Sequence, residues 1–434
     1  MPDQRFGLFG WHHDSNKGDA AIVRGLMWEL NRQLGPAAYT LFAGVRKTNP
    51  TLEGLIRYPL PEGCSVEVRP SFVNVDRDDT GLARAVLGAW SVAKLLALLV
   101  LARVPGLRDL HRRLRELGRC QALLGKGGHY IYARGELRGY LALWLSLAPV
   151  LLAQARGIPV VLLGVTVGPF QSERARRLAI RTFSRCASIS VRDEASFDLL
   201  QTLLDDRGNY HQVTDLAFGI RLDPVSPPSQ PRLFVNLRGS DPGTAGGQAR
   251  WQRTLEEVLR EVQRARPELE LVPLVTAAGT EEVWEADRSS EDDRLATMDL
   301  LTALGRDDLD RAYFERFAQI SPVDTAREIQ ESSGGIAVRF HGGILSLLAG
   351  RPCVLLDYFG TKAQTFQALG LGEWVTSFDG LEEPNERARV VALLTAFVDD
   401  PERYAHEARE AALEAIRRLS VDPSITELRR LMGG

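Results

Sequence analysis

Short apolar segments alternate with amphipathic segments along most of this chain, and this alternation restricts its fold more than any other feature. The apolar run Pro159–Gly164 (PVVLLG) has the length and β-branched content of a buried strand. The basic stretch Arg174–Arg185 that follows has the periodicity of a helix. Strands separated by helices of this length usually pair in parallel, with helices on both faces of the sheet. The pattern therefore predicts an α/β fold.

The same reading predicts the remaining elements. In the first half we expect strands over Arg5–Phe9, Tyr39–Phe42, Cys120–Leu124 and Ala187–Val191, and helices over about Ala20–Leu34, Gly139–Ala155 and Glu194–Leu204. In the second half we expect strands over Leu233–Leu237, Leu269–Val275, Ile336–Arg339 and Pro352–Asp357, and helices over Gln252–Arg264, His341–Ala349 and the charged stretch from Asn385 onward. The acidic stretch Glu281–Asp299 is expected to be a surface insertion.

A proline-rich segment separates the two halves. The segment 223–231 (DPVSPPSQP) holds four prolines, which lack the backbone donor that helices and sheets need. At 434 residues the chain is also longer than a single core usually supports. We therefore expect an N-terminal Rossmann-like domain over 1–222 and a C-terminal one over 232–434, joined by this linker. Two such domains, with parallel sheets facing a central cleft, describe a GT-B-like architecture.

Composition excludes some classes of protein. The formal net charge of -3 argues against a nucleic-acid partner, because phosphate affinity requires a basic surface. The four cysteines are scattered, without the spacing of a disulfide framework or a metal site, and no metal is expected. The start of the chain lacks the basic and apolar regions of a signal peptide, so we expect a cytoplasmic protein.

The apolar stretch Ala85–Ala102 (AVLGAWSVAKLLALLVLA) is long enough to suggest a membrane span. Lys94 lies at its middle, where a charge costs about 2.5–3.5 kcal/mol in a bilayer. A buried or interdomain helix is one interpretation. The other is a helix that rests on the inner face of the membrane, with Arg84, Arg103 and a basic segment beside it.

Three loops of the first half follow expected strands, at the edge where doubly wound sheets bind ligands. Gly10–Asp19 (GWHHDSNKGD) precedes a helix, and Asp19 stands where a helix cap would suffice to explain it. Gly125–His129 (GKGGH) is explained equally by a tight turn or by a ligand close to the backbone. Arg192 in SVRDEAS either binds an anionic ligand or pairs with Asp193 or Glu194.

The segment 334–362 (GGIAVRFHGGILSLLAGRPCVLLDYFGTK) carries the strongest signal. Arg339 and His341 alternate with Phe340, so in an extended segment both side chains point the same way. The pair places a permanent cation beside a group that transfers protons near neutral pH. Gly342 and Gly343 then open a helix whose N-terminus favours an anion. Tyr358 and Lys362 follow the next strand at the same edge.

These residues resemble the signature of the polysaccharide pyruvyl transferase family. The resemblance runs from about Phe6 to Gly370, and its blocks occur in the family's order. The blocks are N-x-G-D (Asn16, Gly18, Asp19), the glycine turn Gly127–Gly128, S-V-R-D-E-x-S (Ser190–Ser196), D-x-A-F within Thr214–Phe218, R-x-H (Arg339, His341), Gly350-x-Pro352 and Y-x-x-x-K (Tyr358, Lys362). The lysine in GKGGH, the long apolar helix and the acidic stretch depart from the pattern.

The resemblance implies a transferase that moves the pyruvyl group of phosphoenolpyruvate onto a sugar or glycan precursor, forming a ketal in bacterial polysaccharide biosynthesis. It implies no cofactor beyond that donor substrate, with the acceptor on the side of the N-terminal domain and the donor on the side of the C-terminal domain. The implied catalytic residues are His341, Arg339 and Asp19; Arg192, Arg339, His341, Lys362 and Tyr358 would bind the donor, and Asn16, Gly18, Asp19, Gly127, Gly128 and His129 the acceptor.

Other functions stay open on the sequence. A GT-B glycosyltransferase would bind a nucleotide sugar in its C-terminal lobe, although no clear ribose carboxylate is visible there. A family member in a natural-product pathway would use a different acceptor or donor, and the arginine and alanine richness suits the GC-rich genomes in which such pathways are common. A homo-oligomer and a peripheral membrane contact are both compatible with the sequence.

Overall fold

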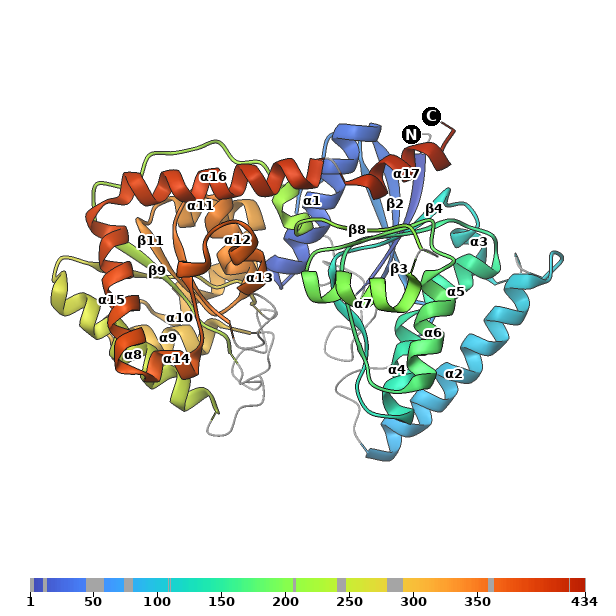
Figure 1. The fold of residues 1–434 in the computed structure, drawn as a ribbon, viewed down its shortest axis with the longest axis horizontal. Coiled ribbons are helices and arrows are strands. Elements are labelled where there is room, and N and C mark those ends of the chain that lie inside the picture. Colours follow the sequence, from blue (N-terminus) through green and yellow to red (C-terminus); the bar gives the residue numbers. More distant parts are fainter. Residues whose placement is uncertain are drawn as a thin grey trace. The chain divides into compact units, whose positions relative to one another are not determined.

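The chain forms two compact units, each built on its own parallel sheet (Figure 1). The first unit groups Met1–Asp14, Ile22–Leu216 and Arg418–Gly434, and the second groups Ser15–Ala21 and Ala217–Arg417. The structure is a computed structural model that describes residues 4–10, 14–43, 58–73, 81–107, 109, 111–205, 208–239, 247–278, 292–357, 363–420 and 422–433.

The first unit holds an eight-stranded sheet in the order β3-β2-β1-β4-β6-β7-β8, with β5 paired to β6. Every pairing in it is parallel, as the alternation of strands and helices predicts. Its strands are β1 (Gln4–Phe9), β2 (Ala37–Ala43), β3 (Ser65–Pro70), β4 (Ala122–Gly125), β5 (Gly128–Ala133), β6 (Val160–Phe170), β7 (Ser188–Val191) and β8 (Tyr210–Gln212). Its helices are α2 (Gly81–Arg103), α3 (Arg112–Leu117), α4 (Leu137–Ser146), α5 (Ala148–Ala155), α6 (Glu173–Phe183), α7 (Glu194–Leu204), α17 (Pro423–Leu431) and the greater part of α1 (Lys17–Leu34), whose first residues, up to Ala21, are grouped with the second unit.

Two details of the first unit differ from the sequence prediction. The single helix expected over Gly139–Ala155 is two helices, α4 and α5, bent by 56°. Pro149 stands in the first turn of α5, where its missing N–H is harmless to the new helix but ends the hydrogen-bond ladder of the preceding one. The strand expected to end at Gly164 continues as β6 to Phe170, because its second half pairs with β5.

The second unit holds a five-stranded parallel sheet in the order β10-β9-β11-β12-β13. Its strands are β9 (Arg232–Asn236), β10 (Glu270–Pro273), β11 (Gly334–Ala337), β12 (Cys353–Leu356) and β13 (Val375–Thr376). Its helices are α8 (Gly247–Ala265), α9 (Arg294–Ala303), α10 (Arg311–Glu315), α11 (Pro322–Gln330), α12 (Phe340–Leu348), α13 (Ala363–Ala368), α14 (Phe378–Glu382), α15 (Pro384–Asp399) and α16 (Pro401–Ser420), with short 3-10 turns η2 (Leu216–Gly219), η3 (Arg316–Ala318) and η4 (Gly372–Trp374).

The proline-rich segment 223–231 contains neither helix nor strand and is grouped with the second unit. Buried Arg351 holds it there by donating hydrogen bonds to the carbonyl oxygens of Val225 (3.1 Å) and Ser226 (2.9 Å). Burial of an arginine is tolerated when its N–H groups are hydrogen-bonded in this way.

The acidic stretch Glu281–Asp299 is not simply the surface insertion that its charge predicted. Its described part, from Asp292 onward, includes two buried aspartates and the first turns of α9. Asp293 is wholly buried, and it accepts hydrogen bonds from main chain and from an arginine. Acidic side chains are usually exposed, but Asp293 can be buried because it pairs with Arg339.

The strand order of each sheet identifies the edge where a ligand would bind. In doubly wound sheets that place lies beyond the carboxyl ends of the strands, where the direction of the strand order reverses. The reversal falls between β1 and β4 in the first unit and between β9 and β11 in the second. β4 runs into the GKGGH turn, and β11 runs into Arg339.

Candidate functional site

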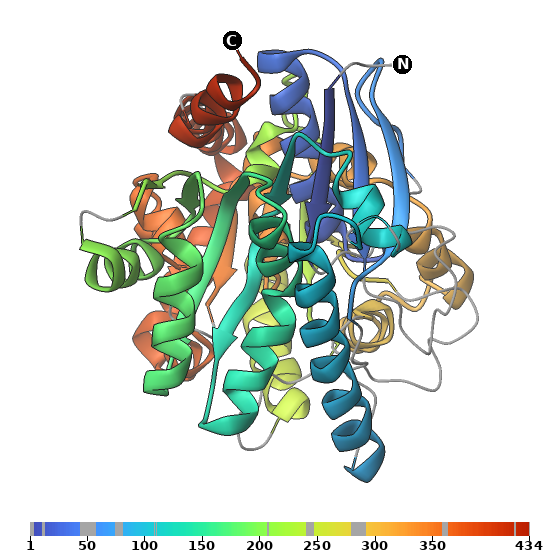
Figure 2. The ribbon, with the colours of Figure 1, turned by 90° about the vertical axis from the view of Figure 1, so that its right-hand side faces the viewer.

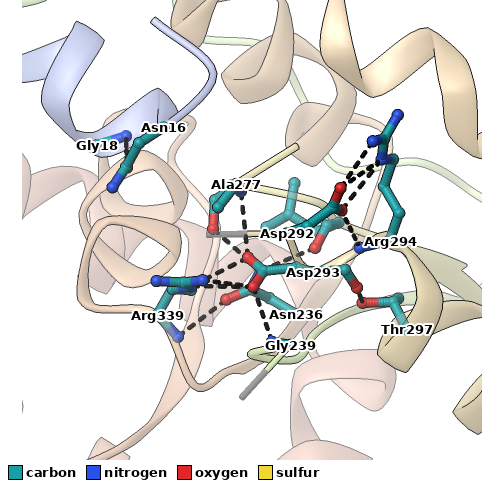
Figure 3. A network of polar contacts seen from close by, with 12 residues as sticks. Asn16, Gly18, Asn236, Gly239, Ala277, Asp292, Asp293, Arg294, Thr297 and Arg339 are labelled. Atoms are coloured by element: carbon teal, nitrogen blue, oxygen red, sulfur yellow. Dashed lines mark hydrogen bonds and ion pairs between the residues drawn. The ribbon is translucent and has the colours of Figure 1, made fainter. Parts of the chain in front are cut away.

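Arg339 lies at the reversal point of the second unit and is held by Asp293 (Figure 3). Its Nε donates to Asp293 Oδ2 at 3.0 Å, and its Nη2 donates to Asp293 Oδ1 at 2.5 Å. The Asp293 side chain is fully buried, whereas 16% of the Arg339 side chain is exposed. A two-point pair of this kind fixes the plane of the guanidinium while leaving part of it accessible.

The main chain holds Asp293 from the other side. Its Oδ1 accepts from the N–H of Gly239 (2.9 Å) and its Oδ2 from the N–H of Ala277 (3.1 Å). Burial raises the pKa of this carboxyl, and the charge of Arg339 opposes that rise. Asn236, the last residue of β9, accepts a hydrogen bond from the Arg339 N–H at 3.0 Å. The arginine is therefore positioned through both its side chain and its backbone.

The N-x-G-D motif belongs to this same unit. The Lys17 N–H donates to the carbonyl oxygen of Thr276 at 2.7 Å, and the Ala278 N–H donates to that of Ser15 at 3.0 Å. Asn16 caps α1, because its Oδ1 accepts from the Gly18 N–H at 3.0 Å (Figure 3). The prediction that Asp19 occupies the cap position was therefore wrong, since Asp19 lies in the first turn of the helix.

Gly18 lies directly against His341. A Cβ atom added to Gly18 would stand 2.3 Å from His341 Nδ1, so any other residue would require the His341 side chain to move. His341 is in the first turn of α12, and Arg339 is the N-cap residue of that helix. The strand predicted to reach Arg339 ends at Ala337, and the helix predicted from His341 begins at Phe340, so Arg339 and His341 do not alternate along an extended segment. Because α12 begins at Phe340, His341 lies on its first turn. From there its side chain packs against Gly18 of the N-x-G-D motif.

The two glycines after His341 are explained by packing. A Cβ atom on Gly342 would stand 2.9 Å from Asn236 Oδ1, and one on Gly343 would stand 2.9 Å from Phe366 Cζ. Both glycines let α12 approach the strands and α13 closely. Their presence needs no ligand as its reason.

In the first unit, Arg192 follows β7 and pairs with Asp215. Its Nη1 donates to Asp215 Oδ2 at 2.5 Å, and its Nε donates to Thr166 Oγ1 at 2.9 Å. Asp215 is buried, and 13% of the Arg192 side chain is exposed. The surface pairing with Asp193 or Glu194 that the sequence left open is not the one that holds Arg192. Asp193 instead caps α7 and accepts from Thr166 Oγ1.

The GKGGH turn lies at the reversal point of the first unit. Gly128 has a φ of 135°, which favours glycine, and a Cβ on Gly127 would meet the Gly164 carbonyl oxygen at 3.0 Å. His129 Nε2 lies 2.8 Å from the Gly168 carbonyl oxygen. Burial lowers the pKa of His129, and the charge of Arg192 adds to that effect. The turn geometry thus accounts for both glycines.

The structure groups the predicted residues by unit rather than by predicted subsite. Asn16, Gly18, Asp19, Arg339 and His341 lie in the second unit. A second group, consisting of Gly127, Gly128, His129 and Arg192, lies in the first. Tyr358 and Lys362 lie outside the described residues.

Sequence reasoning missed the two aspartates that hold the arginines. Asp215 lies in the Thr214–Phe218 block, so its position in a family motif was a usable signal. Asp293 stands within an acidic stretch that looks like an exposed surface, and no local pattern distinguishes it. Only its contact with Arg339, 46 residues away, identifies it.

Solved structures similar to this chain include glycosyltransferases and an epimerase, at sequence identities that speak only for the fold. A UDP-glucosyltransferase from Polygonum tinctorium superposes with a TM-score of 0.54 at 14% identity, covering 100% of both chains. UGT2 of Phytolacca americana gives a TM-score of 0.53 at 13% identity over 99% of each chain. A putative UDP-N-acetylglucosamine 2-epimerase from Listeria monocytogenes gives 0.51 at 12% identity, over 94% of this chain and 91% of that one. The predicted GT-B-like fold is confirmed.

Sequence comparison identifies the family. The amylovoran biosynthesis protein AmsJ of Erwinia amylovora is 21% identical over 429 residues, which cover 93% of this chain and 95% of AmsJ. The family profile of polysaccharide pyruvyl transferase matches residues 16–359, beginning at the asparagine that caps α1. The resemblance expected from the motifs is confirmed, and the chain belongs to the polysaccharide pyruvyl transferase family, a family of transferases.

Proposed function

We propose that this transferase moves the pyruvyl group of phosphoenolpyruvate onto two hydroxyls of a sugar or glycan precursor, forming a cyclic ketal. The observation that carries the proposal is Arg339, oriented by buried Asp293 at the reversal point of the second sheet. His341 and the N-x-G-D motif lie in the same unit and contact each other through Gly18. Family membership and the biosynthetic role in the name of AmsJ agree with a polysaccharide substrate.

Phosphoenolpyruvate carries a phosphate and a carboxylate, so its binding requires fixed cations. Arg339 is prepared for this role because Asp293 and Asn236 hold it before any ligand arrives. Arg192, which Asp215 orients in a similar way, is a second donor-binding candidate. Tyr358 and Lys362 complete the proposed donor-binding set, and no resident cofactor or metal is required.

The proposed reaction is an addition followed by a displacement of phosphate. A proton is delivered to the methylene carbon of phosphoenolpyruvate, and the first sugar hydroxyl bonds to C2 and loses its proton to a base. The second hydroxyl then bonds to C2 as the C–O bond to phosphate breaks, and its proton leaves with the phosphate. One phosphoenolpyruvate and one diol thus give one ketal and one inorganic phosphate.

Each step has a candidate residue in the second unit. His341 is our candidate acid for the methylene carbon, because an imidazole transfers protons near neutral pH. Asp19, half-buried in the first turn of α1, is our candidate to accept the first hydroxyl proton or to bind the sugar. Arginines that gain contact with the departing phosphate would stabilise the transition state. On the acceptor side we place Asn16 and Gly18, together with Gly127, Gly128 and His129 of the first unit.

The first test is calorimetric titration of the protein with phosphoenolpyruvate, and separately with uridine diphosphate. We expect phosphoenolpyruvate to bind and the Arg339→Lys variant to raise its Kd about 10- to 100-fold, because a lysine cannot make the two-point contact. Lysine is preferable to alanine here, since it leaves a cation beside buried Asp293.

Arg266→Lys is the matched control for this titration. Arg266 also pairs with an aspartate, Asp399, through its Nε at 2.6 Å, but it does so on the exposed surface of the same unit. Its substitution should leave the Kd unchanged. An unaltered Kd in Arg339→Lys would contradict the donor role of Arg339. Binding of uridine diphosphate without binding of phosphoenolpyruvate would instead point to nucleotide-sugar chemistry.

A further inference from the structure

The exposed surface of α2 is unusually apolar. Among the described residues, ten large apolar side chains are exposed, and seven of them lie between Val86 and Leu107. Trp90 is 68% exposed, Val100 60% and Val86 59%. Figure 2 shows α2 as a long helix along the outside of the first unit. Single exposed apolar residues are ordinary, but a continuous group of this size marks an interaction surface.

The exposed residues form one continuous stripe. Val86, Trp90, Ala93, Ala97 and Val100 are all exposed and follow a spacing of four, three, four and three, which places them on one face of a helix. We call these five residues the α2 stripe. The opposite face packs into the core of the first unit through Leu95, Leu98, Leu99 and Ala102. α2 is therefore apolar on its free face as well as on its packed face.

The segment that contains the α2 stripe is strongly basic. Residues 81–119 contain eight lysines and arginines and two acidic residues, although the whole chain has a formal net charge of -3. Of the two acids, Glu116 lies within 3.0 Å of Arg69 and 3.1 Å of Arg112, and Asp109 lies within 3.0 Å of Arg156. Lys94 and Arg103 fall on the borders between the two faces of the helix. This surface is complementary to an anionic one that also accepts apolar side chains.

We propose that α2 binds the surface of an anionic phospholipid bilayer, with the α2 stripe inserted at the boundary between headgroups and acyl chains. An apolar face bordered by basic side chains is the recognised form of an interfacial helix. Val86–Arg103 is also apolar enough to cross a membrane by length and composition, and 28% of it is buried. Its packed face, however, belongs to the core of the first unit, so the helix lies along the bilayer rather than through it.

This inference goes beyond the proposed reaction, because it concerns where the protein works. A protein held on a bilayer meets sugar acceptors carried on lipids at a higher local concentration than acceptors in solution. Membrane attachment is therefore expected to increase the rate of reaction with a lipid-linked acceptor. This expectation rests on the proposed function. The attachment itself requires neither donor nor acceptor.

The test is co-sedimentation of the full chain with vesicles of phosphatidylcholine, with and without phosphatidylglycerol, in the absence of substrates. We expect binding to the vesicles that contain phosphatidylglycerol, weakened by salt. The Trp90→Ser/Val100→Ser variant should bind them at least about tenfold more weakly, because two inserted side chains are lost. Arg103→Gln/Arg115→Gln should also weaken binding, and only to the anionic vesicles.

Leu413→Ser/Val225→Ser is the matched control, because it removes two exposed apolar side chains outside the α2 stripe. It should bind vesicles as the unaltered protein does. Absence of binding to anionic vesicles would overturn the proposal. So would a dimer that sedimentation velocity detects and that Trp90→Ser/Val100→Ser abolishes without any vesicle binding, since a second copy would then cover the stripe. Phosphoenolpyruvate titration of the same variants tests the proposed function separately. A variant that loses vesicle binding but keeps its Kd for phosphoenolpyruvate has lost only the membrane attachment.

Discussion

In both units an arginine that follows a strand is held by a buried aspartate. Asp293 holds Arg339 and Asp215 holds Arg192, and in each pair the carboxylate is nearly inaccessible while the guanidinium is partly exposed. The buried partner removes rotational freedom from the arginine before a ligand binds, so less entropy is lost on binding. Each pair also leaves a fixed cation at the carboxyl edge of its own sheet, which suits the recognition of an anion.

Gly18 offers a residue-scale test of His341. In Gly18→Ala the added methyl group would collide with the imidazole, because it would stand only 2.3 Å from Nδ1. We expect the imidazole to move and the Kd for phosphoenolpyruvate, measured by calorimetry, to rise at least about tenfold through a lost or misplaced contact. Far-ultraviolet circular dichroism should show an intact fold, since alanine favours a helix.

Gly88→Ala is the control for that experiment. Gly88 is also inside a helix, α2, and a Cβ atom there would meet no atom within 4 Å. Its substitution should leave the Kd unchanged and stabilise the protein by about 0.5–1 kcal/mol. Unaltered affinity in Gly18→Ala would remove His341 from the donor site.

At the scale of elements, α17, the last helix, packs against strands β6, β7 and β8 of the first unit. Asp422 caps this helix by accepting from the Ser424 N–H at 2.8 Å, and its Oδ2 accepts from Ser190 Oγ of β7 at 2.9 Å. Ser188 Oγ lies 2.8 Å from Ser424 Oγ. Burial raises the pKa of Asp422 to about 6, although its hydrogen bonds act against the rise.

This raised pKa predicts a pH-dependent stability. The pKa of Asp422 is higher in the native state than in the unfolded state, so protonation of this carboxyl favours folding. This contribution to the free energy of unfolding is fully present below the ordinary pKa of 3.8 and is lost as the pH rises through about 6. Asp422→Asn keeps the capping oxygen and cannot ionise. The unaltered protein therefore loses stability between pH 4 and pH 7, whereas Asp422→Asn does not lose this contribution. We expect the free energy of unfolding of Asp422→Asn minus that of the unaltered protein to increase by about 2–3 kcal/mol over this range.

Urea denaturation at several pH values measures this difference. Asp310→Asn is the matched control, because Asp310 caps α10 from an exposed position and accepts from the Tyr313 N–H at 2.9 Å. Its effect should be small at every pH. A flat difference for Asp422→Asn would mean that Asp422 is ionised in the native protein throughout this range.

At the scale of the whole molecule, neither unit is a continuous piece of chain. The first unit includes the C-terminal residues Arg418–Gly434, and the second includes Ser15–Ala21 from near the start. Ile425 and Leu428 of α17 are fully buried in the first unit. Strand β1 and helix α17, from opposite ends of the sequence, therefore belong to the same unit (Figure 1).

Removal of the last helix should accordingly loosen the first unit. In a chain ending at Ser420 we expect the amides of β7 and β8 to exchange with deuterium more than about tenfold faster, because two buried apolar side chains and the Asp422 bonds are lost. Hydrogen exchange by mass spectrometry measures this, with β9 and β11 of the second unit as the internal control. Equal acceleration in both units would show that they unfold as one.

The sequence by itself determined the class of fold and the family. Strand and helix periodicities are properties of neighbouring residues, so the alternation of PVVLLG-like runs with amphipathic stretches was enough to predict parallel sheets. The motif order from Asn16 to Lys362 was enough to predict the family, because motifs are read along the chain. The strand ends that carry Arg192 and Arg339 were predictable for the same reason.

Only the tertiary structure decided which residues meet. The pairing of Arg339 with Asp293, and the contact of Gly18 with His341, depend on strand order and helix packing between distant segments. Local pattern also placed Asp19 in the cap position and extended a strand to Arg339, whereas Asp19 lies inside α1, β11 ends at Ala337 and Arg339 is the N-cap of α12. Composition showed that α2 is apolar all round, but only its contacts with the core decided which face is left exposed. Long-range contacts of this kind leave no periodic trace in a single sequence, because either partner alone looks like any other surface or core residue.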